Sequence, residues 1–187
     1  MAQFILASGS PRRKQLLEWA EVDFEVCVQE TAETFPPHLS PADAAMHIAA
    51  GKAHAVQNFL KTPAPIIAAD TIVVLNGEII GKPKDREDGI QILQRLSGKI
   101  HTVITGVVMV NSKTEISFSD ATEVEFYPLT REQITFYIDK YKPYDKAGAY
   151  AIQEWIGVTG IKRINGDFYN VMGLPVSRVV QTLEKFR

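Results

Sequence analysis

Hydrophobic residues follow two repeating patterns along the first part of the chain. Short apolar runs at residues 3–7, 23–28 and 66–75 predict buried strands. Apolar positions at helical spacing predict helices at residues 11–20 and 41–60. Each of these helices begins with Ser-Pro, where serine can cap the helix and proline fits its first position. Strands and helices are therefore expected to alternate from the N-terminus.

An Asn-Gly pair at 76–77 stands between two apolar runs and predicts a tight β-hairpin, because both turn positions need positive φ. The remaining predicted elements are helices at 85–96 and 130–140, strands at 99–110, 114–127 and 159–164, and a last helix from Pro175. Helices that alternate with mixed strands, some of them long, predict an α/β fold with a mixed sheet and flanking helices. No linker or repeat divides residues 1–187, so we expect a single domain.

Composition limits the class of protein. The chain has 187 residues, 45% of them hydrophobic, which is enough for one substantial core or one core with an attached lobe. The formal net charge of -2 argues against nucleic acid as the main ligand, so any attraction for phosphate must be local. A single cysteine, Cys27, fits a reducing compartment. With no recognisable signal segment or membrane-spanning run, we expect a cytoplasmic protein that does not bind a membrane.

Three cations follow the first predicted strand in the segment ASGSPRRKQLL. At helical spacing, Arg13 points along the apolar stripe of the helix and Arg12 flanks that stripe, whereas Lys14 faces solvent. A helix N-terminus with two guanidinium groups can clamp a phosphate. The same arginines could instead pair with carboxylates elsewhere, and spacing alone leaves both alternatives open.

The second predicted helix also carries a charge on its apolar face. Lys52 projects into the arc formed by Ala49, Ala53 and neighbouring apolar residues. A lysine rarely occupies such a stripe unless it is paired or lines a cleft. His47 and His54 lie on one side of this helix without a third ligand nearby, and we interpret them as surface residues unrelated to metal.

A carboxylate interrupts the apolar strand at 66–75. Period-two alternation places Asp70 on the same face as Ile66 and Ala68, where it needs a cation or a metal. A two-residue hairpin turn would return Lys82 beside the Asp70-Thr71 end of the strand, so a purely structural aspartate–lysine pair is one alternative. The other alternative is a catalytic base with a neighbouring cation.

Two further segments carry weaker signals. Residues 144–153, YDKAGAYAIQ, combine small residues with the polar side chains Lys146 and Gln153, which could contact a ligand or lie in a solvated loop. Charged groups on apolar faces of three separate elements fit a cleft for a phosphorylated small molecule with a divalent metal. The chain has no P-loop or Rossmann fingerprint that would explain them.

These segments resemble the Maf family, the septum-formation-inhibitor-like nucleoside triphosphate pyrophosphatases. Five ordered blocks carry the resemblance over nearly the whole chain: LASGSPRRKQLL, AADTIVVLNGEIIGKP, LSGKIHTVITGV, DKAGAYAIQ and INGDFYNVMGLP. The resemblance implies a fold like that of inosine triphosphate pyrophosphatases, with two lobes around a deep cleft. It also implies hydrolysis of a nucleoside triphosphate to the monophosphate and pyrophosphate with a divalent cation, Mg²⁺ or Mn²⁺.

The resemblance also implies roles for particular residues. Asp70 matches the family's catalytic carboxylate, the proton acceptor that activates water. Lys52 and Lys82 match lysines of the active site. The other matches are Ser8, Arg12 and Arg13 for phosphate, and Glu33, which with Asp70 is expected to help hold the metal.

Within the family, Arg12, Thr71 and Gln153 are typical of the branch that hydrolyses dTTP and UTP. The chain departs from the family pattern at three positions. Ala151 and Glu154-Trp155 stand where relatives commonly have glycine, so the base preference could differ. The alternatives are the same chemistry on methylated or other noncanonical nucleotides, or a nucleotide-binding regulator of cell division. The resemblance further suggests a homodimer.

Overall fold

The computed structural model of the chain describes residues 4–61 and 63–186 and has a mixed α/β architecture. Its strands form one seven-stranded sheet with the order β2-β1-β3-β5-β6-β7, and β4 pairs with β3. Strand β1 runs parallel to β2 and β3, whereas the β3–β4 and β6–β7 pairs are antiparallel. The prediction of a mixed sheet with flanking helices is therefore confirmed.

The chain divides into two compact units. The first unit comprises Met1–Thr71, Thr105–Asp120 and Gly173–Arg187, and the second comprises Ile72–Ile104 and Ala121–Met172. Three long strands contribute to both units: β3 (Ile66–Leu75), β5 (Ile100–Val110) and β6 (Glu115–Phe126). The prediction of a single domain over 1–187 stays a prediction.

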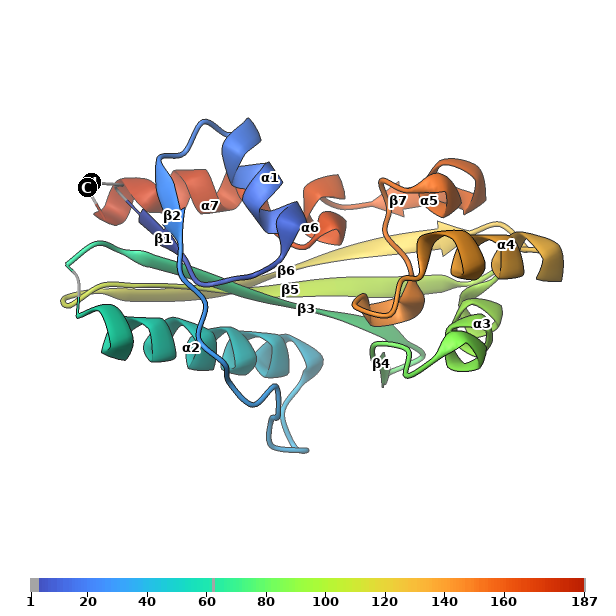
Figure 1. Cartoon of the computed structure of the whole chain (residues 1–187), viewed down its shortest axis with the longest axis horizontal. Helices are drawn as coiled ribbons and strands as arrows, with labels where there is room; N and C mark the ends of the chain where they lie inside the picture. Colours follow the sequence, from blue (N-terminus) through green and yellow to red (C-terminus); the bar gives the residue numbers. More distant parts are fainter. Residues whose placement is uncertain (1–3, 62, 187) are drawn as a thin grey trace. The chain divides into compact units, whose positions relative to one another are not determined.

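In the first unit, helices cover both faces of the sheet. Its other elements are β1 (Phe4–Leu6), α1 (Pro11–Trp19), β2 (Phe24–Val26), α2 (Pro41–Leu60), α7 (Val176–Leu183) and the short η2 (Glu184–Phe186). Helix α2 lies on one face of the strands, and α1 and α7 lie on the other (Figure 1). The α2 face buries Ala49, Ala53 and Val56 against alternate residues of β1, β3 and β5, as the helical spacing predicts.

Gly106 allows α2 to approach β5 closely. A Cβ atom at this position would lie 2.4 Å from the backbone nitrogen of Met46 and 2.5 Å from the carbonyl carbon of Ala45. No side chain fits at such distances, so glycine is required where the helix backbone meets the strand. This contact fixes the height of α2 above the sheet, and with it the position of every side chain that α2 directs at β3.

The second unit contains the shorter elements. They are β4 (Glu78–Ile80), α3 (Arg86–Leu96), α4 (Arg131–Tyr141), the 3₁₀ turn η1 (Ala147–Ala149), α5 (Trp155–Gly160), β7 (Ile161–Asn165) and α6 (Phe168–Met172). The Asn76-Gly77 turn is confirmed, since both residues have positive φ (53° and 81°) and Leu75 pairs with Glu78. No helix in the described ranges combines the length and apolar character needed to cross a membrane.

Most of the predicted elements occur within a residue or two of the expected bounds, and the main error lies near residue 160. A strand was expected at 159–164, but Thr159 and Gly160 end helix α5 and the strand begins at Ile161. The segment WIGVTG has two glycines and β-branched residues, which disfavour a helix. Contacts with distant residues accompany this helix, since the Trp155 ring packs on Phe136 of α4 and a Cβ at Gly160 would lie 2.9 Å from the Leu129 side chain.

A buried histidine lies in the core of the second unit. His101 of β5 is 1% exposed, stacks on Phe126, and its Nε2 lies 2.7 Å from the Tyr150 hydroxyl oxygen. Its Nδ1 has no hydrogen-bond partner in the described part of the chain. Burial lowers the pKa of His101 from 6.5 to about 4 and raises the pKa of Tyr150, so both groups are neutral in the folded protein near neutral pH.

This histidine should make the stability of the protein depend on pH. The unfolded chain protonates His101 below about pH 6.5 and the folded chain only near its lowered pKa, so stability falls as pH drops between these values. We expect a loss of about 2 kcal/mol in the free energy of unfolding between pH 7 and pH 5 from this residue. Urea denaturation of the wild type and of His101→Gln measures it. An equal pH dependence in both proteins would contradict the assignment.

Candidate active site

Strand β3 places two candidate residues on opposite faces of the sheet. Asp70 continues the series of Ile66 and Ala68 on the α2 face, where its Oδ1 lies 2.6 Å from Lys52 Nζ. Thr71 is directed to the other face, where its Oγ1 accepts a hydrogen bond of 3.0 Å from Arg13 of α1. The strand thus separates an ion-pair cluster from an arginine network, although the two residues are neighbours in sequence.

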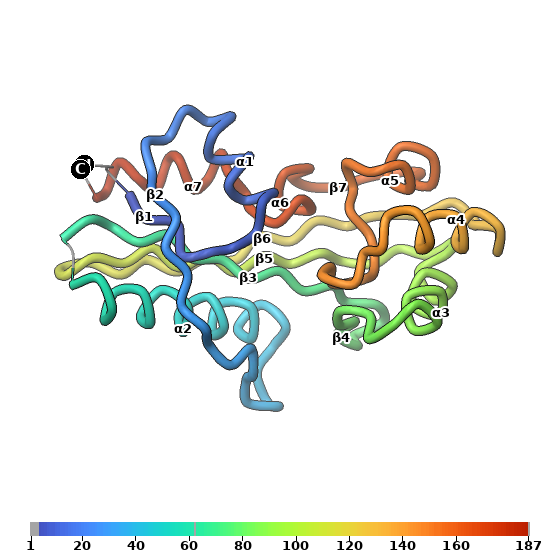
Figure 2. Tube along the Cα trace, in the orientation of Figure 1, coloured from blue at the N-terminus to red at the C-terminus, as the bar shows by residue number. Residues whose placement is uncertain are grey.

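Lys52 joins two carboxylates. Besides Asp70, its Nζ lies 2.8 Å from Oε1 of Glu33, which belongs to the connection between β2 and α2. Figure 2 follows this connection, in blue, to the N-terminal end of α2. The side chains of Lys52 and Asp70 are 15% and 13% exposed, and that of Glu33 is 44% exposed. The Lys52 ammonium group thus holds the Asp70 carboxylate in place through an ion pair of 2.6 Å.

Arg13 forms a buried network in the first unit. Its Nε donates to the Gly173 carbonyl at 2.7 Å, and its two terminal nitrogens donate to Ser8 Oγ at 3.1 Å and Thr71 Oγ1 at 3.0 Å. Burial lowers the pKa of this guanidinium, and the negative charge of Asp70 opposes that shift. The prediction that Arg13 points along the apolar stripe is confirmed, and most of its hydrogen-bonding capacity is used inside the protein.

The residues at the start of α1 and just before it complete the segment ASGSPRRKQLL. Ser8 is buried and accepts a hydrogen bond from the backbone nitrogen of Ser10. Ser10 occupies the N-cap position, but its side chain makes no capping bond, contrary to the expected role. Arg12 is half-buried, and Lys14 is exposed and pairs with Glu18 at 3.6 Å. The three cations therefore differ in environment as predicted.

Thr105 was not predicted to belong to this region. It is fully buried in β5, and its Oγ1 lies 2.9 Å from the Thr71 hydroxyl oxygen. Thr71 thus meets Arg13, Thr105 and the Gly173 carbonyl, the last at 3.4 Å. A threonine within the apolar run VITGVVMV is a sequence signal for a buried hydrogen bond, but the signal does not name its partner.

The second unit contains the other predicted residues. Strand β4 ends at Ile80, so the expected pairing of Thr71 with Lys82 is not formed and Lys82 lies exposed beyond the strand. The alternative that residues 144–153 form a solvated loop is wrong, because residues 148–152 are buried. Lys146 lies 2.8 Å from Asp145 Oδ1 and 3.9 Å from Glu154 Oε1, and Gln153 is exposed.

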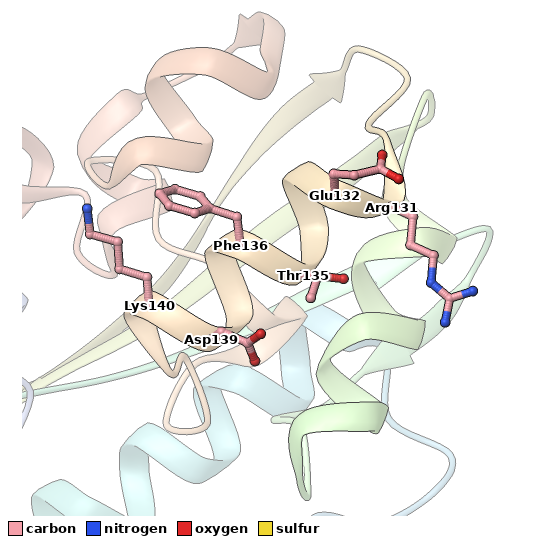
Figure 3. A pocket seen from close by; sticks show the side chains of 6 residues that line it. All are labelled: Arg131, Glu132, Thr135, Phe136, Asp139 and Lys140. Carbon is pink, nitrogen blue, oxygen red and sulfur yellow. The ribbon is translucent and has the colours of Figure 1, made fainter.

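A shallow surface depression on α4 has no part in this chemistry. Figure 3 shows its lining side chains projecting from one helix; they are Arg131, Glu132, Thr135, Phe136, Asp139 and Lys140. Asp139 is already held by Arg86 of α3, with 2.6 Å between Arg86 Nε and the carboxylate. None of these residues was predicted as a site residue, and they do not converge on a common point.

The family profile described as "Maf-like protein" matches residues 3–186, which is nearly the whole chain. This chain belongs to the Maf family. Among similar proteins, one from Cytophaga hutchinsonii is 50% identical and the match covers 97% of this chain and 83% of that protein. One from Bacteroides thetaiotaomicron is 45% identical, covering 98% and 95%. Both carry the name "dTTP/UTP pyrophosphatase".

A further relative from Bacillus cytotoxicus, with the same name, is 47% identical over 100% of this Maf chain and 96% of its own length. Among solved structures, the Staphylococcus aureus Ham1 protein matches 66% of this chain and 71% of its own with 17% identity and a TM-score of 0.49. That distant likeness does not bear on function. The resemblance to the Maf family predicted from sequence is confirmed.

The residues of the Maf chain fit a divalent metal in one place. Glu33 and Asp70 supply hard carboxylate oxygens, and both of them contact the Lys52 ammonium group, at 2.8 Å and 2.6 Å. Mg²⁺ commonly uses one or two carboxylates together with substrate phosphates and water. In the described ranges no group of three or more His, Cys, Asp or Glu side chains could hold a metal, so the protein would supply at most part of the coordination.

Replacing Arg13 should destabilise the Maf chain strongly. Arg13→Met leaves the Gly173 carbonyl and two hydroxyl groups without their donor in a buried place, and we expect a loss of about 3 kcal/mol in the free energy of unfolding. The adjacent Lys14→Met is the matched control, because its exposed ion pair is worth roughly 0.5 kcal/mol. Urea denaturation compares them. Equal losses would show that the Arg13 network does not stabilise the fold.

Proposed function

We propose that this Maf protein hydrolyses dTTP and UTP to the nucleoside monophosphate and pyrophosphate. The single observation that carries the proposal is the pairing of Asp70 with Lys52 on the otherwise apolar α2 face. An ionised carboxylate fixed by a cation is poised to take a proton from water. The names of the similar proteins support the substrates, since all three relatives described above are dTTP/UTP pyrophosphatases.

In the proposed reaction, water attacks a phosphorus atom of the bridge between the α- and β-phosphates. Asp70 accepts a proton of the attacking water, the new P–O bond forms, and the bridging P–O bond breaks. Its electron pair leaves on pyrophosphate if the α-phosphorus is attacked, or on the nucleoside monophosphate if the β-phosphorus is attacked. Lys52 lies beside this carboxylate and offsets the negative charge that builds on phosphate oxygens. Glu33 orients Lys52 from the other side, so the ammonium is held in place before substrate binds.

Glu33 and Asp70 are the residues that would hold Mg²⁺ or Mn²⁺, which when bound supplies positive charge to the phosphate oxygens. Ser8, Arg12 and Arg13 are assigned to phosphate binding and Lys146 to the substrate, whereas Lys82 is assigned to catalysis with Asp70 and Lys52. For Arg13 this role is mainly indirect, because its donors serve Gly173, Ser8 and Thr71. The buried arginine holds the loop before α1, and the half-buried Arg12 is the better candidate for direct contact.

Base preference is assigned to Arg12, Thr71 and Gln153. The Thr71 hydroxyl already contacts Arg13 and Thr105, so Thr71 would shape the site through its methyl group and its hold on Arg13. Gln153 is exposed, and a carboxamide can both donate and accept, as recognition of a uracil or thymine edge requires. The cytoplasmic location and the homodimer remain predictions.

The proposed base can be tested by Asp70→Asn, which removes the proton acceptor but keeps the shape of the side chain. We expect turnover of UTP to fall by about 10²- to 10⁴-fold. Pyrophosphate and UMP, identified by chromatography, should be the wild-type products. Asp139→Asn, an exposed aspartate on α4, is the control and should keep normal turnover. Near-normal turnover of Asp70→Asn would exclude Asp70 as the base, and release of orthophosphate would exclude the reaction class.

Gln153→Ala tests the assignment of base preference. Removing the carboxamide should reduce the ratio of kcat/KM between UTP and CTP by roughly tenfold, because a hydrogen bond to the base edge is lost. The kcat for UTP should change much less than this ratio. Steady-state kinetics with each nucleotide measure both quantities. An equal loss on every nucleotide would argue against a role for Gln153 in selecting the base.

A further inference from the structure

A tyrosine of α4 ties together the two ends of the turn that carries Gln153. The Tyr137 hydroxyl donates a hydrogen bond to Oε2 of Glu154 and accepts one from the backbone nitrogen of Ala151 at 3.1 Å. The Glu154 backbone nitrogen in turn donates to the Ala151 carbonyl at 3.1 Å. Residues 151–154 are therefore closed by one side chain and by their own backbone.

Two aromatic residues at this turn, Tyr137 and Trp155, are held by packing. Tyr137 is fully buried, and its ring stacks on Tyr141 with 4.9 Å between centroids. The next residue after Glu154 also packs on α4, since the Trp155 ring meets Phe136 edge-to-face at 4.8 Å. Glu154 and Trp155 thus both turn toward α4. These two residues attach the segment to the helix.

The same segment is anchored further back along the chain. The Tyr150 hydroxyl meets His101, and the Gly148 nitrogen donates to the Gly81 carbonyl at 3.2 Å. A Cβ at Gly148 would lie 3.0 Å from the Val73 side chain, so the small residue is needed for close packing. Gln153 is the exposed residue of a turn whose neighbours on both sides are fixed.

We propose that Glu154 is a positioning residue for base selection, acting through Tyr137 to fix the turn that presents Gln153. The inference rests on the proposed function, because it requires Gln153 to contact the base. A carboxamide can offer its oxygen or its NH₂ group to the same partner. Uracil and cytosine have opposite donor and acceptor patterns at N3 and C4. Fixing the backbone of residues 151–154 limits the positions from which the Gln153 carboxamide can reach that edge, and so helps it to favour one pattern.

The second oxygen of Glu154 provides a way to separate two effects. Oε1 lies 3.9 Å from Lys146 Nζ, so the negative charge of Glu154 also acts on a lysine assigned to the substrate. Glu154→Gln keeps an oxygen that can accept from Tyr137 but removes the charge. Glu154→Ala removes both. If Glu154 acts by positioning, only Glu154→Ala should lower the selectivity for UTP over CTP. If it acts through its charge, both variants should change that selectivity equally.

The test is steady-state kinetics with UTP and CTP. We expect Glu154→Ala and Tyr137→Phe each to lower the ratio of their kcat/KM values by roughly five- to tenfold, with kcat for UTP changed much less. Glu154→Gln should keep the ratio within about twofold, while KM shifts equally for both nucleotides. The double variant Glu154→Ala/Tyr137→Phe should lower the ratio no further than either single variant, because both changes remove the same hydrogen bond.

Tyr141→Phe is the matched control, since it removes a hydroxyl from the same helix, keeps the stacked ring and should leave the ratio unchanged. If Tyr137→Phe fails to fold, the pair Glu154→Ala and Glu154→Gln decides the question. An unchanged ratio in Glu154→Ala, or an equal loss in Glu154→Gln, would overturn the inference while leaving the proposed function standing. Wild-type protein that releases no pyrophosphate from UTP would overturn both.

Discussion

The contact between Lys52 and Asp70 is the interaction on which the candidate site depends. It places two opposite charges on a face that is otherwise packed with alanine, valine and isoleucine. Neither charge could remain there alone, because an unpaired ion that is largely removed from water is strongly disfavoured. The pair is therefore a structural requirement of the α2 face, and in the proposed function it also supplies the carboxylate that accepts a proton from water.

The geometry of this pair follows from backbone contacts elsewhere in the first unit. Gly106 brings α2 close to β5, and this closeness sets how far the Lys52 side chain must reach to meet β3. On the other face of the same strand, the buried Arg13 connects α1, β3 and the Gly173 carbonyl. One strand thus supports two polar systems of different kinds, one suited to proton transfer and one suited to holding a loop.

In the second unit, the segment with the proposed role in base selection is held by hydrogen bonds of buried tyrosines rather than by an ion pair. Its segment of small residues packs tightly through Gly148 and is attached by two tyrosine hydroxyl groups, Tyr150 to His101 and Tyr137 to Glu154. Tyr150 and Tyr137 are both buried, so their hydrogen bonds are directional and well shielded from water. A short loop with little regular structure can present a polar side chain reproducibly only with supports of this kind.

Local sequence patterns were enough to predict the strands, the principal helices and the faces on which the unusual charges lie. Period-two alternation placed Asp70 on the α2 face, and helical spacing placed Lys52 and Arg13 on apolar stripes, because these periods are properties of the local backbone. The Asn76-Gly77 turn could be predicted for the same reason. Local periodicity does not say which element lies opposite a given face.

The partners of these side chains depend on contacts between elements that are distant in sequence. Spacing suggested Lys82 as one possible partner of Asp70 and gave no sign of Lys52, whose Nζ on a separate helix lies 2.6 Å from Asp70 Oδ1. Thr105, the Gly173 carbonyl and the link between Tyr137 and Glu154 join residues far apart in sequence, and no local pattern encodes them. The short helix α5 is similar, because its sequence disfavours a helix and its Trp155 packs on Phe136 of α4. Local patterns fix which side chains leave the solvent, and long-range packing fixes what they meet there.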